Sequence, residues 1–294
     1  MSIWLDFFGA EIRYVDTPTY GRTRIAEAGK DKAETLILMH GIGGHIEAYA
    51  KNVVALGQDF HVIAFDFVGH GLSAKPTDIV YNPSVYVEQL RELMDAMGID
   101  KAHISGESLG GLVAGAFAIK YPERVLRMVL NTAGGIPIVS EKGRQDLADL
   151  ATLSAKNVGK PPTAETVRAR MQWLIHESNW ERLLDDELVA SRLTIYQQPD
   201  FQAAAPLVFA RLNRAADGDT KPDMVELEQI EAESLLFWTK YNPIHDVDAA
   251  EAALPRLKHG KLYVMKGDAA HWPQYEWPEE FNTVVTRYLK TGEV

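Results

Sequence analysis

Short apolar segments recur along the chain, and most are followed by a turn and a segment with helical spacing. The apolar segments cover residues 35–39, 60–65, 102–105, 125–130, 234–238 and 261–265, and the helical segments include 47–56, 83–97, 247–254 and 278–289. Strands with nearly continuous apolar sequence are typical of a parallel sheet that helices bury on both faces. Residues 10–15 and 22–28 flank a turn and predict an antiparallel hairpin. We therefore predict an α/β fold with a mostly parallel eight-stranded sheet and helices on both faces.

Residues 136–222 interrupt this pattern. They contain no strand candidate, and amphipathic stretches at 164–175, 185–196 and 201–212 predict helices. We predict a helical cap over 136–222, inserted into one α/β core made of residues 1–135 and 223–294. A cap at this point would lie over the carboxyl ends of the strands, where open α/β sheets bind ligands.

The segment Gly106-Glu107-Ser108-Leu109-Gly110 joins a predicted strand to a helix rich in small residues. In that context G-x-S-x-G is typical of a sharp turn that holds a serine hydroxyl at the end of a sheet. The N–H groups at the start of the helix point to the same place. We predict that Ser108 is a nucleophile. The alternative is an ordinary strand–helix turn, because glycine and serine are common residues.

A serine hydroxyl needs a base that takes its proton. His271 follows the last predicted strand, in Ala269-Ala270-His271-Trp272-Pro273, and is the candidate base. His245 and His259 are nearby in the sequence but fit this role less well. We interpret the following histidines as satisfied, surface or scaffold side chains: His61, His70, His103, His176 and His259. No histidine pair has zinc-site spacing to carboxylates.

The negative charge that develops on an attacked carbonyl oxygen needs backbone N–H donors. We predict one donor from Leu109, the residue after the nucleophile. The other is expected from the glycine-rich loop that begins at His40, where Ile42 is the best candidate. A flexible turn is the alternative interpretation of this loop.

The acid expected after the strand at 234–238 is replaced by Asn242. An amide oxygen can accept a hydrogen bond from the histidine Nδ1–H, but it cannot stabilise the imidazolium by charge. In serine proteases, Asp→Asn in this role lowers kcat by about 10⁴. Asp246 or Asp248 could substitute for the missing acid, although both are also placed to cap the helix that begins near Val247.

Composition limits the possible partners. The chain has 294 residues, of which 46% are hydrophobic and 24% charged, and its formal net charge is −11. An acidic chain is a poor partner for nucleic acid or anionic membrane, although one buried arginine can still bind a small anionic substrate. It has no cysteine, no signal-peptide pattern and no apolar stretch that would span a bilayer. We expect a cytoplasmic protein with a small-molecule substrate; homo-oligomer formation is left open.

These motifs together resemble the α/β-hydrolase fold family and, within it, the meta-cleavage product hydrolases, the C–C bond hydrolases of bacterial aromatic degradation. The resemblance runs over nearly the whole chain. It is carried by His40-Gly41, by residues 66–73 and 106–111, by Trp238…Asn242-Pro243 and by residues 271–276. Members of that family cleave 2-hydroxy-6-oxo-hexa-2,4-dienoates without a cofactor or a metal.

The resemblance also implies substrate contacts at Asn52, Arg192 and Trp272, with the Arg192 guanidinium on the dienoate carboxylate. Without the resemblance, Arg192 would be a solvated helix charge and Trp272 ordinary core packing. The chain departs from the family at the glycine loop, at Glu107, where asparagine is frequent, and at Asn242. A carboxylate at Glu107 disfavours an anionic substrate unless it is protonated or points away.

Three hypotheses about function follow. The main one is a C–C bond hydrolase of meta-cleavage products that acts through Ser108 and His271. The second is a carboxylesterase or lactonase that uses the same residues, because one fold hosts many activities. The third is a ligand-binding protein that kept the pocket and lost most turnover, which Asn242 favours.

Overall fold

The computed structural model describes residues 2–155, 160–216 and 223–294. One sheet has the strand order β1-β2-β4-β3-β5-β6-β7-β8. The strands are β1 (Glu11–Thr17), β2 (Gly21–Ala28), β3 (Thr35–Met39), β4 (His61–Phe65), β5 (Ala102–Glu107), β6 (Val125–Asn131), β7 (Glu233–Trp238) and β8 (Gly260–Val264). Strand β2 is antiparallel to β1 and to β4, and all other neighbours are parallel. The predicted fold class is confirmed.

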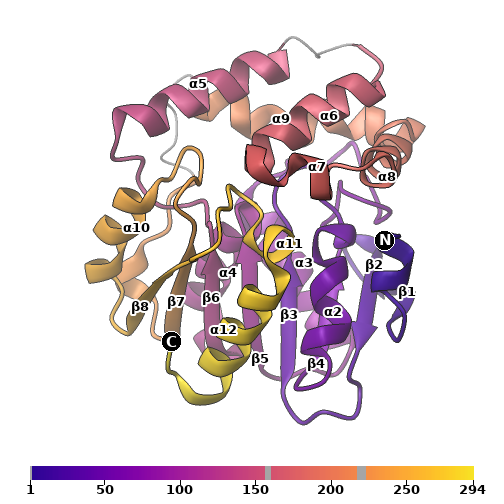
Figure 1. The fold of residues 1–294 in the computed structure, drawn as a ribbon. Helices are drawn as coiled ribbons and strands as arrows, with labels where there is room; N and C mark the ends of the chain where they lie inside the picture. Colours follow the sequence, from indigo (N-terminus) through magenta and orange to yellow (C-terminus); the bar gives the residue numbers. More distant parts are fainter. Residues whose placement is uncertain (1, 156–159, 217–222) are drawn as a thin grey trace.

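Helices cover both faces of the sheet (Figure 1). One face carries α3 (Pro83–Ala96), α4 (Leu109–Lys120) and α10 (Val247–Ala253), and the other carries α2 (Ala50–Leu56) and α12 (Pro278–Thr291). Strand β3 shows why both faces are apolar: Leu36 and Leu38 pack into one core, Ile37 and Met39 into the other. Short elements complete the core: α1 (Ile3–Asp6), α11 (Pro273–Glu276) and 3-10 turns at Ile46–Tyr49, Pro122–Arg124, Leu227–Gln229 and Leu254–Arg256.

The segment predicted as the cap forms a helical layer above one end of the sheet (Figure 1). Its helices are α5 (Glu141–Ala155), α6 (Ala164–Leu174), α7 (Trp180–Leu183), α8 (Asp186–Tyr196) and α9 (Pro199–Ala216), with a 3-10 turn at Glu177–Asn179. The sequence pattern indicated α6, α8 and α9. It missed α5, which is mostly polar and has a glycine in its first turn. The predicted end of the cap, at residue 222, lies outside the described residues.

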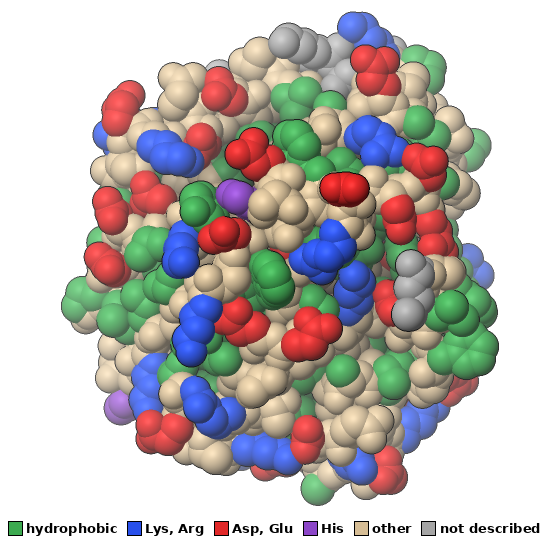
Figure 2. Space-filling model, viewed as in Figure 1, with side chains coloured by type: hydrophobic (Ala, Val, Ile, Leu, Met, Phe, Trp, Pro, Cys, Tyr) green, Lys and Arg blue, Asp and Glu red, His purple; other side chains and the backbone are tan. Residues whose placement is uncertain are grey.

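The surface is polar and mixed in charge on the face that Figure 2 shows, where acidic and basic side chains are interspersed. Within the three described ranges, no helix combines the length and the hydropathy that crossing a bilayer requires.

Candidate active site

Ser108 lies at the junction of β5 and α4, with φ 52° and ψ −111°. Residues with a Cβ rarely adopt positive φ, so this serine is held in a strained turn. The glycines beside it allow the turn. A Cβ on Gly106 would lie 2.1 Å from the Gly110 carbonyl oxygen, and a Cβ on Gly110 would lie 2.3 Å from the Met39 carbonyl oxygen. The side chain of Ser108 is thus presented at the wall of a cavity.

His271 lies in the loop between β8 and α11 and is 6% exposed. Its Nδ1 is 2.7 Å from Asn242 Oδ1. Asn242 Nδ2 donates to the His245 carbonyl oxygen, which leaves Oδ1 to accept from the imidazole Nδ1–H. The neutral ring therefore has its lone pair on Nε2, which is the tautomer that a base for Ser108 needs.

The two aspartates considered as substitutes for Asn242 lie at the start of helix α10. Asp246 caps α10, where its carboxylate accepts a 3.2 Å hydrogen bond from Ala249 N–H. Asp248 is exposed in the first turn of the same helix. The hydrogen bond of His271 Nδ1 goes to Asn242 and to neither aspartate. The expectation that one of them replaces Asn242 is not supported.

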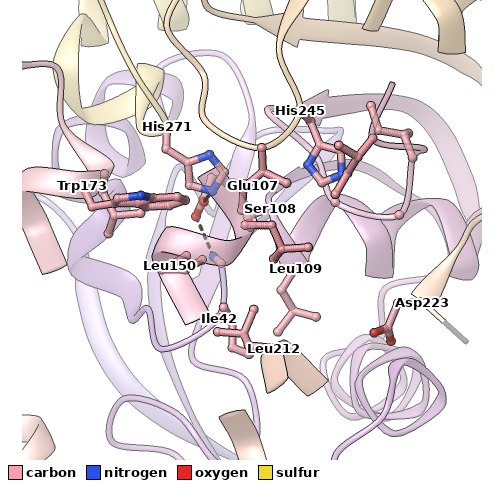
Figure 3. A pocket seen from close by; sticks show the side chains of 18 of the residues that line it. Ile42, Glu107, Ser108, Leu109, Leu150, Trp173, Leu212, Asp223, His245 and His271 are labelled. Atoms are coloured by element: carbon pink, nitrogen blue, oxygen red, sulfur yellow. Dashed lines mark hydrogen bonds and ion pairs between the residues drawn. The ribbon is translucent and has the colours of Figure 1, made fainter. Parts of the chain in front are cut away.

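Glu107 faces the other nitrogen of the same imidazole ring (Figure 3). Its Oε1 is 3.1 Å from His271 Nε2, and its Oε2 accepts a 2.6 Å hydrogen bond from Gly41 N–H. The residue is 1% exposed. At this distance the carboxylate can pair with the imidazolium form of the ring, in which Nε2 carries a proton. The carboxyl group is thereby directed at the base and at the glycine loop.

Ile42 and Leu109, whose backbone N–H groups are the expected donors, line the same cavity as Ser108. Neither N–H group has a hydrogen-bond acceptor among the described residues, so both are available to an oxyanion. The glycine loop is held in place by His40, which is fully buried and accepts from Phe67 N–H at 3.1 Å. Burial lowers the pKa of His40 to about 3, so this ring stays neutral.

A cavity of about 550 Å³ lies between the sheet and the helical layer. Figure 3 shows Trp173, His271, Glu107 and Ser108 along its wall, with Ile42 and Leu109 below them. The helical layer contributes apolar and basic side chains, including Leu150, Arg170, Trp173, Arg192 and Leu212. The cavity is large enough for a small organic substrate.

Arg192 of α8 lines this cavity and is only 1% exposed, so it is not a solvated helix charge. Its Cζ lies 5.1 Å from the centre of the Trp272 ring. Its Nε is 3.4 Å from His45 Nε2, and its Nη2 is buried with no partner among the described residues. A buried guanidinium without a carboxylate is costly, and an anionic ligand would remove that cost.

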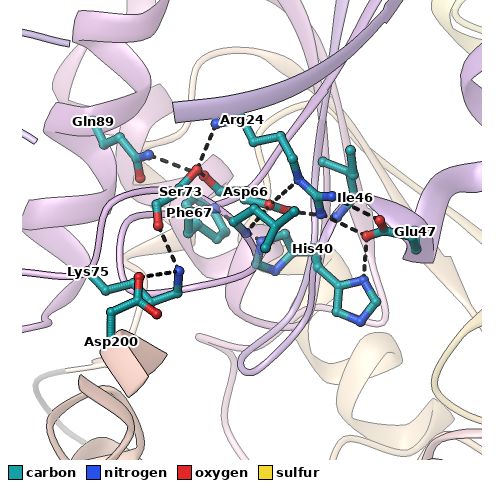
Figure 4. Close-up of polar contacts among 12 residues, drawn as sticks. Arg24, His40, Ile46, Glu47, Asp66, Phe67, Ser73, Lys75, Gln89 and Asp200 are labelled. Carbon is teal, nitrogen blue, oxygen red and sulfur yellow. Dashed lines mark hydrogen bonds and ion pairs between the residues drawn. The ribbon is translucent and has the colours of Figure 1, made fainter. Parts of the chain in front are cut away.

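A chain of polar contacts leads from Arg192 through His45 to Glu47 and Arg24. Figure 4 shows its Glu47, Arg24 and Asp66 part. His45 Nδ1 is 2.6 Å from Glu47 Oε2, and Glu47 accepts two hydrogen bonds from Arg24, which also donates to Asp66. Burial opposes ionisation of Glu47, but His45 and Arg24 hold its pKa well below its usual range. Because His45 Nδ1–H donates to Glu47, its Nε2 presents a lone pair to Arg192.

The other two implied substrate contacts differ in position. Trp272 lines the cavity and is 2% exposed. Asn52 is not part of the cavity wall. Helix α2 directs its side chain towards the C-terminal helices, where Nδ2 donates to the Gln274 carbonyl oxygen at 3.0 Å and to Asn282 Oδ1 at 2.8 Å. The expectation that Asn52 contacts the substrate is therefore corrected. Its side chain instead connects α2 to α11 and α12 by hydrogen bonds.

Sequence reasoning missed several side chains of the cavity wall, among them Arg170 and Trp173, and gave His245 no place there. Arg170 and Trp173 are three residues apart on α6, a spacing that places them on one helix face, and this pattern could have drawn attention to them. His245 was considered only as a base. Burial lowers its pKa to about 4, so it remains neutral at the cavity edge.

Glu276 also had no assigned role, although it belongs to the motif that begins at His271. Its carboxyl group accepts hydrogen bonds of 2.8 Å from Ala270 N–H, His176 N–H and Asn179 Nδ2. It therefore joins the loop of the candidate base to the helical layer. Burial raises the pKa of Glu276 to about 7 despite these donors. In the described ranges, no group of three or more His, Asp or Glu side chains is arranged to hold a metal ion.

Residues 34–278 match the family model of the α/β hydrolase fold, so the chain belongs to this family. The 2-hydroxymuconate semialdehyde hydrolase of Pseudomonas sp. (strain CF600) is 27% identical over 276 residues, which cover 92% of each chain. The 2-hydroxy-6-oxo-6-phenylhexa-2,4-dienoate hydrolase of Comamonas testosteroni is 28% identical over 271 residues, 90% of each chain. A solved structure of the meta-cleavage product hydrolase of Pseudomonas fluorescens IP01 aligns with a TM-score of 0.78 at 25% identity, covering 96% of this chain and 98% of that one. The resemblance drawn from the sequence motifs is confirmed.

Proposed function

We propose that the chain hydrolyses a C–C bond in a substrate of the 2-hydroxy-6-oxo-hexa-2,4-dienoate type. The observation that carries this proposal is that one cavity contains a strained serine, a histidine whose Nδ1 faces Asn242 Oδ1, and a buried arginine without a carboxylate partner. A substrate with a ketone near one end and a carboxylate at the other uses all three. The reactions of the relatives, which are 27% and 28% identical, support the same class.

In the proposed mechanism, Arg192 binds the dienoate carboxylate and thereby places the ketone carbon at Ser108. The 2-hydroxyl group of the dienol first loses its proton while C5 gains one, which gives the keto tautomer. His271 Nε2 then removes the Ser108 proton as Oγ attacks C6, and the Ile42 and Leu109 N–H groups hold the oxyanion. The C5–C6 bond breaks with its electron pair delocalised towards C2, His271 returns the proton to that fragment, and water hydrolyses the acyl-serine.

Glu107 provides the charge that Asn242 lacks. The imidazolium that forms on His271 needs a negative charge nearby, and Asn242 Oδ1 offers only an acceptor at Nδ1. The Glu107 carboxylate lies at Nε2 instead and is held there by Gly41 N–H. The proposed site therefore has its acid on the nucleophile side of the ring.

The experiment that tests the C–C bond proposal follows the visible absorbance of a dienolate after enzyme is added, for wild type and for Ser108→Ala. Loss of absorbance with wild type and none with Ser108→Ala supports it. Rapid turnover of simple esters without turnover of any dienoate contradicts it.

The same experiment decides between the alternatives. A carboxylesterase or lactonase would use the same serine, histidine and oxyanion donors, but a neutral ester has no group for Arg192. A binding protein with little turnover, which Asn242 favours, would show tight binding in calorimetry and rates that Ser108→Ala leaves unchanged.

A further inference from the structure

A second arginine faces the cavity and has no role in the proposed reaction. Arg170 lies on α6, with its Cζ 5.4 Å from the centre of the Trp173 ring. Its side chain makes no hydrogen bond or ion pair within the described part of the chain, and its Nη1 is buried without a partner. Burial lowers the pKa of Arg170 to about 10, and the positive charge of Arg192 acts in the same direction. The guanidinium remains charged at neutral pH, although it is unpaired.

The charges around the cavity do not balance. Arg192 also lacks a carboxylate partner, whereas Arg144, a third arginine of the wall, is exposed and paired with a carboxylate on its own helix. Of the two acidic residues in the wall, Glu107 is already bound at the candidate base. Asp223 lies on the opposite side of the cavity from Trp173 (Figure 3). A ligand with one carboxylate would neutralise only one of the two unpaired guanidinium groups.

The two guanidinium groups lie against different indole rings. Arg192 stands against Trp272 and contacts His45 beside the glycine loop. Arg170 stands against Trp173, whose ring centre is 6.0 Å from that of His271. A carboxylate pairs best with a single guanidinium through two parallel hydrogen bonds. Two arginines on different indole rings therefore suit two carboxylates better than one.

We propose that Arg170 forms a second anion subsite and that the substrate is a dicarboxylate. One carboxylate is on the dienoate end, at Arg192, and the other is on the acyl group that is transferred to Ser108, at Arg170. The assignment of the two ends rests on the proposed function. The acid released by hydrolysis of the acyl-serine is then itself a dicarboxylic acid.

Binding of the released acid tests the subsite without requiring turnover. Glutarate and valerate have the same chain length and differ by the second carboxylate. Calorimetric titration of the full chain is expected to show glutarate binding at least about tenfold more tightly than valerate, because hydrogen bonds to charged groups are the strong ones. Arg170→Gln removes this preference and leaves valerate binding unchanged. Arg168→Gln is the matched control, because Arg168 is on the same helix and pairs with the exposed Asp186.

Two results overturn the second subsite: equal affinities of wild type for glutarate and valerate, or an Arg170→Gln variant that weakens both acids equally. Ester kinetics separate this inference from the C–C bond proposal. The 4-nitrophenyl half-ester of glutarate is expected to lose at least about tenfold in kcat/KM in Arg170→Gln, and the valerate ester to lose nothing. A chain with this pattern that cleaves no dienoate keeps the subsite and refutes the C–C bond proposal. Dienoate cleavage without any preference for glutarate supports the C–C bond proposal and refutes the second subsite.

Discussion

Replacing Glu107 by Gln removes the negative charge beside His271 Nε2 and changes little else. The Gln amide oxygen can still accept the hydrogen bond from Gly41 N–H, and the side-chain volume is kept. Glu107 Oε1 lies 3.1 Å from Nε2. With the two charge centres about 4 Å apart and an effective dielectric constant of about 20, the interaction amounts to about 4 kcal/mol. Because desolvation offsets part of it, we expect a loss of about 2–4 kcal/mol, or roughly 30- to 1,000-fold in kcat.

Asn242→Asp completes a double-mutant cycle. It restores a carboxylate at the Nδ1 side, where the contact is 2.7 Å. In the wild-type background the imidazolium is already balanced by Glu107, so we expect less than about a tenfold change in kcat. In the Glu107→Gln background the same substitution is expected to recover most of the lost activity.

The assay is kcat on a dienoate and on a 4-nitrophenyl ester, with thermal melting of each variant as the control for folding. A Glu107→Gln variant with unchanged or higher kcat would refute the reasoning, because it would mean that Glu107 holds His271 away from Ser108. Additive effects in the cycle would also refute it, since the two positions would then not share one role.

Three further predictions concern groups around the site. The folded-state pKa of Glu276 is raised from 4.5 to about 7, so the contribution of this residue to stability is greatest below about pH 4.5 and falls by about 3 kcal/mol as the pH rises to 7. Urea unfolding of wild type between pH 5 and 8 should show this fall in the free energy of unfolding, and Glu276→Gln should reduce it. Equal pH dependence in the two proteins would contradict the assignment. Glu47→Gln loosens the support of Arg192 and is expected to raise KM for an anionic substrate about tenfold with kcat unchanged; a fall in kcat alone would argue against a positioning role. Gly110→Ala forces a Cβ against the Met39 carbonyl oxygen and is expected to cost about 3 kcal/mol or more in the free energy of unfolding, and a variant of wild-type stability would show that the turn is not tightly packed.

The parts of the structure that sequence predicted well depend on local signals. Strand β3 begins and ends at the predicted residues, Thr35 and Met39, because an uninterrupted apolar run leaves no other register for a buried strand. The turn at Ser108 was predictable because its flanking glycines have no space for a side chain. Asn242 was also placed correctly, because it follows a strand whose end is marked by polar residues.

The parts that sequence did not predict depend on contacts between distant segments. The pairing of Glu107 with His271 joins residues 164 positions apart in a way that no periodicity encodes. The position of Arg170 at the cavity depends on how the helical layer packs over the sheet. Asn52 was misplaced because the resemblance does not specify which face of a short helix meets the cavity. Helix α5 was missed because its sequence is mostly polar.

The central claim is that Ser108 cleaves a C–C bond in a dienoate that Arg192 binds. The most direct measurement is a single-turnover reaction of wild type and Ser108→Ala with such a dienoate, followed by its absorbance and by analysis of the released acid. We predict that both proteins bind the dienoate, that wild type releases one acid per active site, and that Ser108→Ala releases none. Release of the acid by Ser108→Ala at the wild-type rate, or no cleavage by wild type under conditions where simple esters are hydrolysed, would contradict the account.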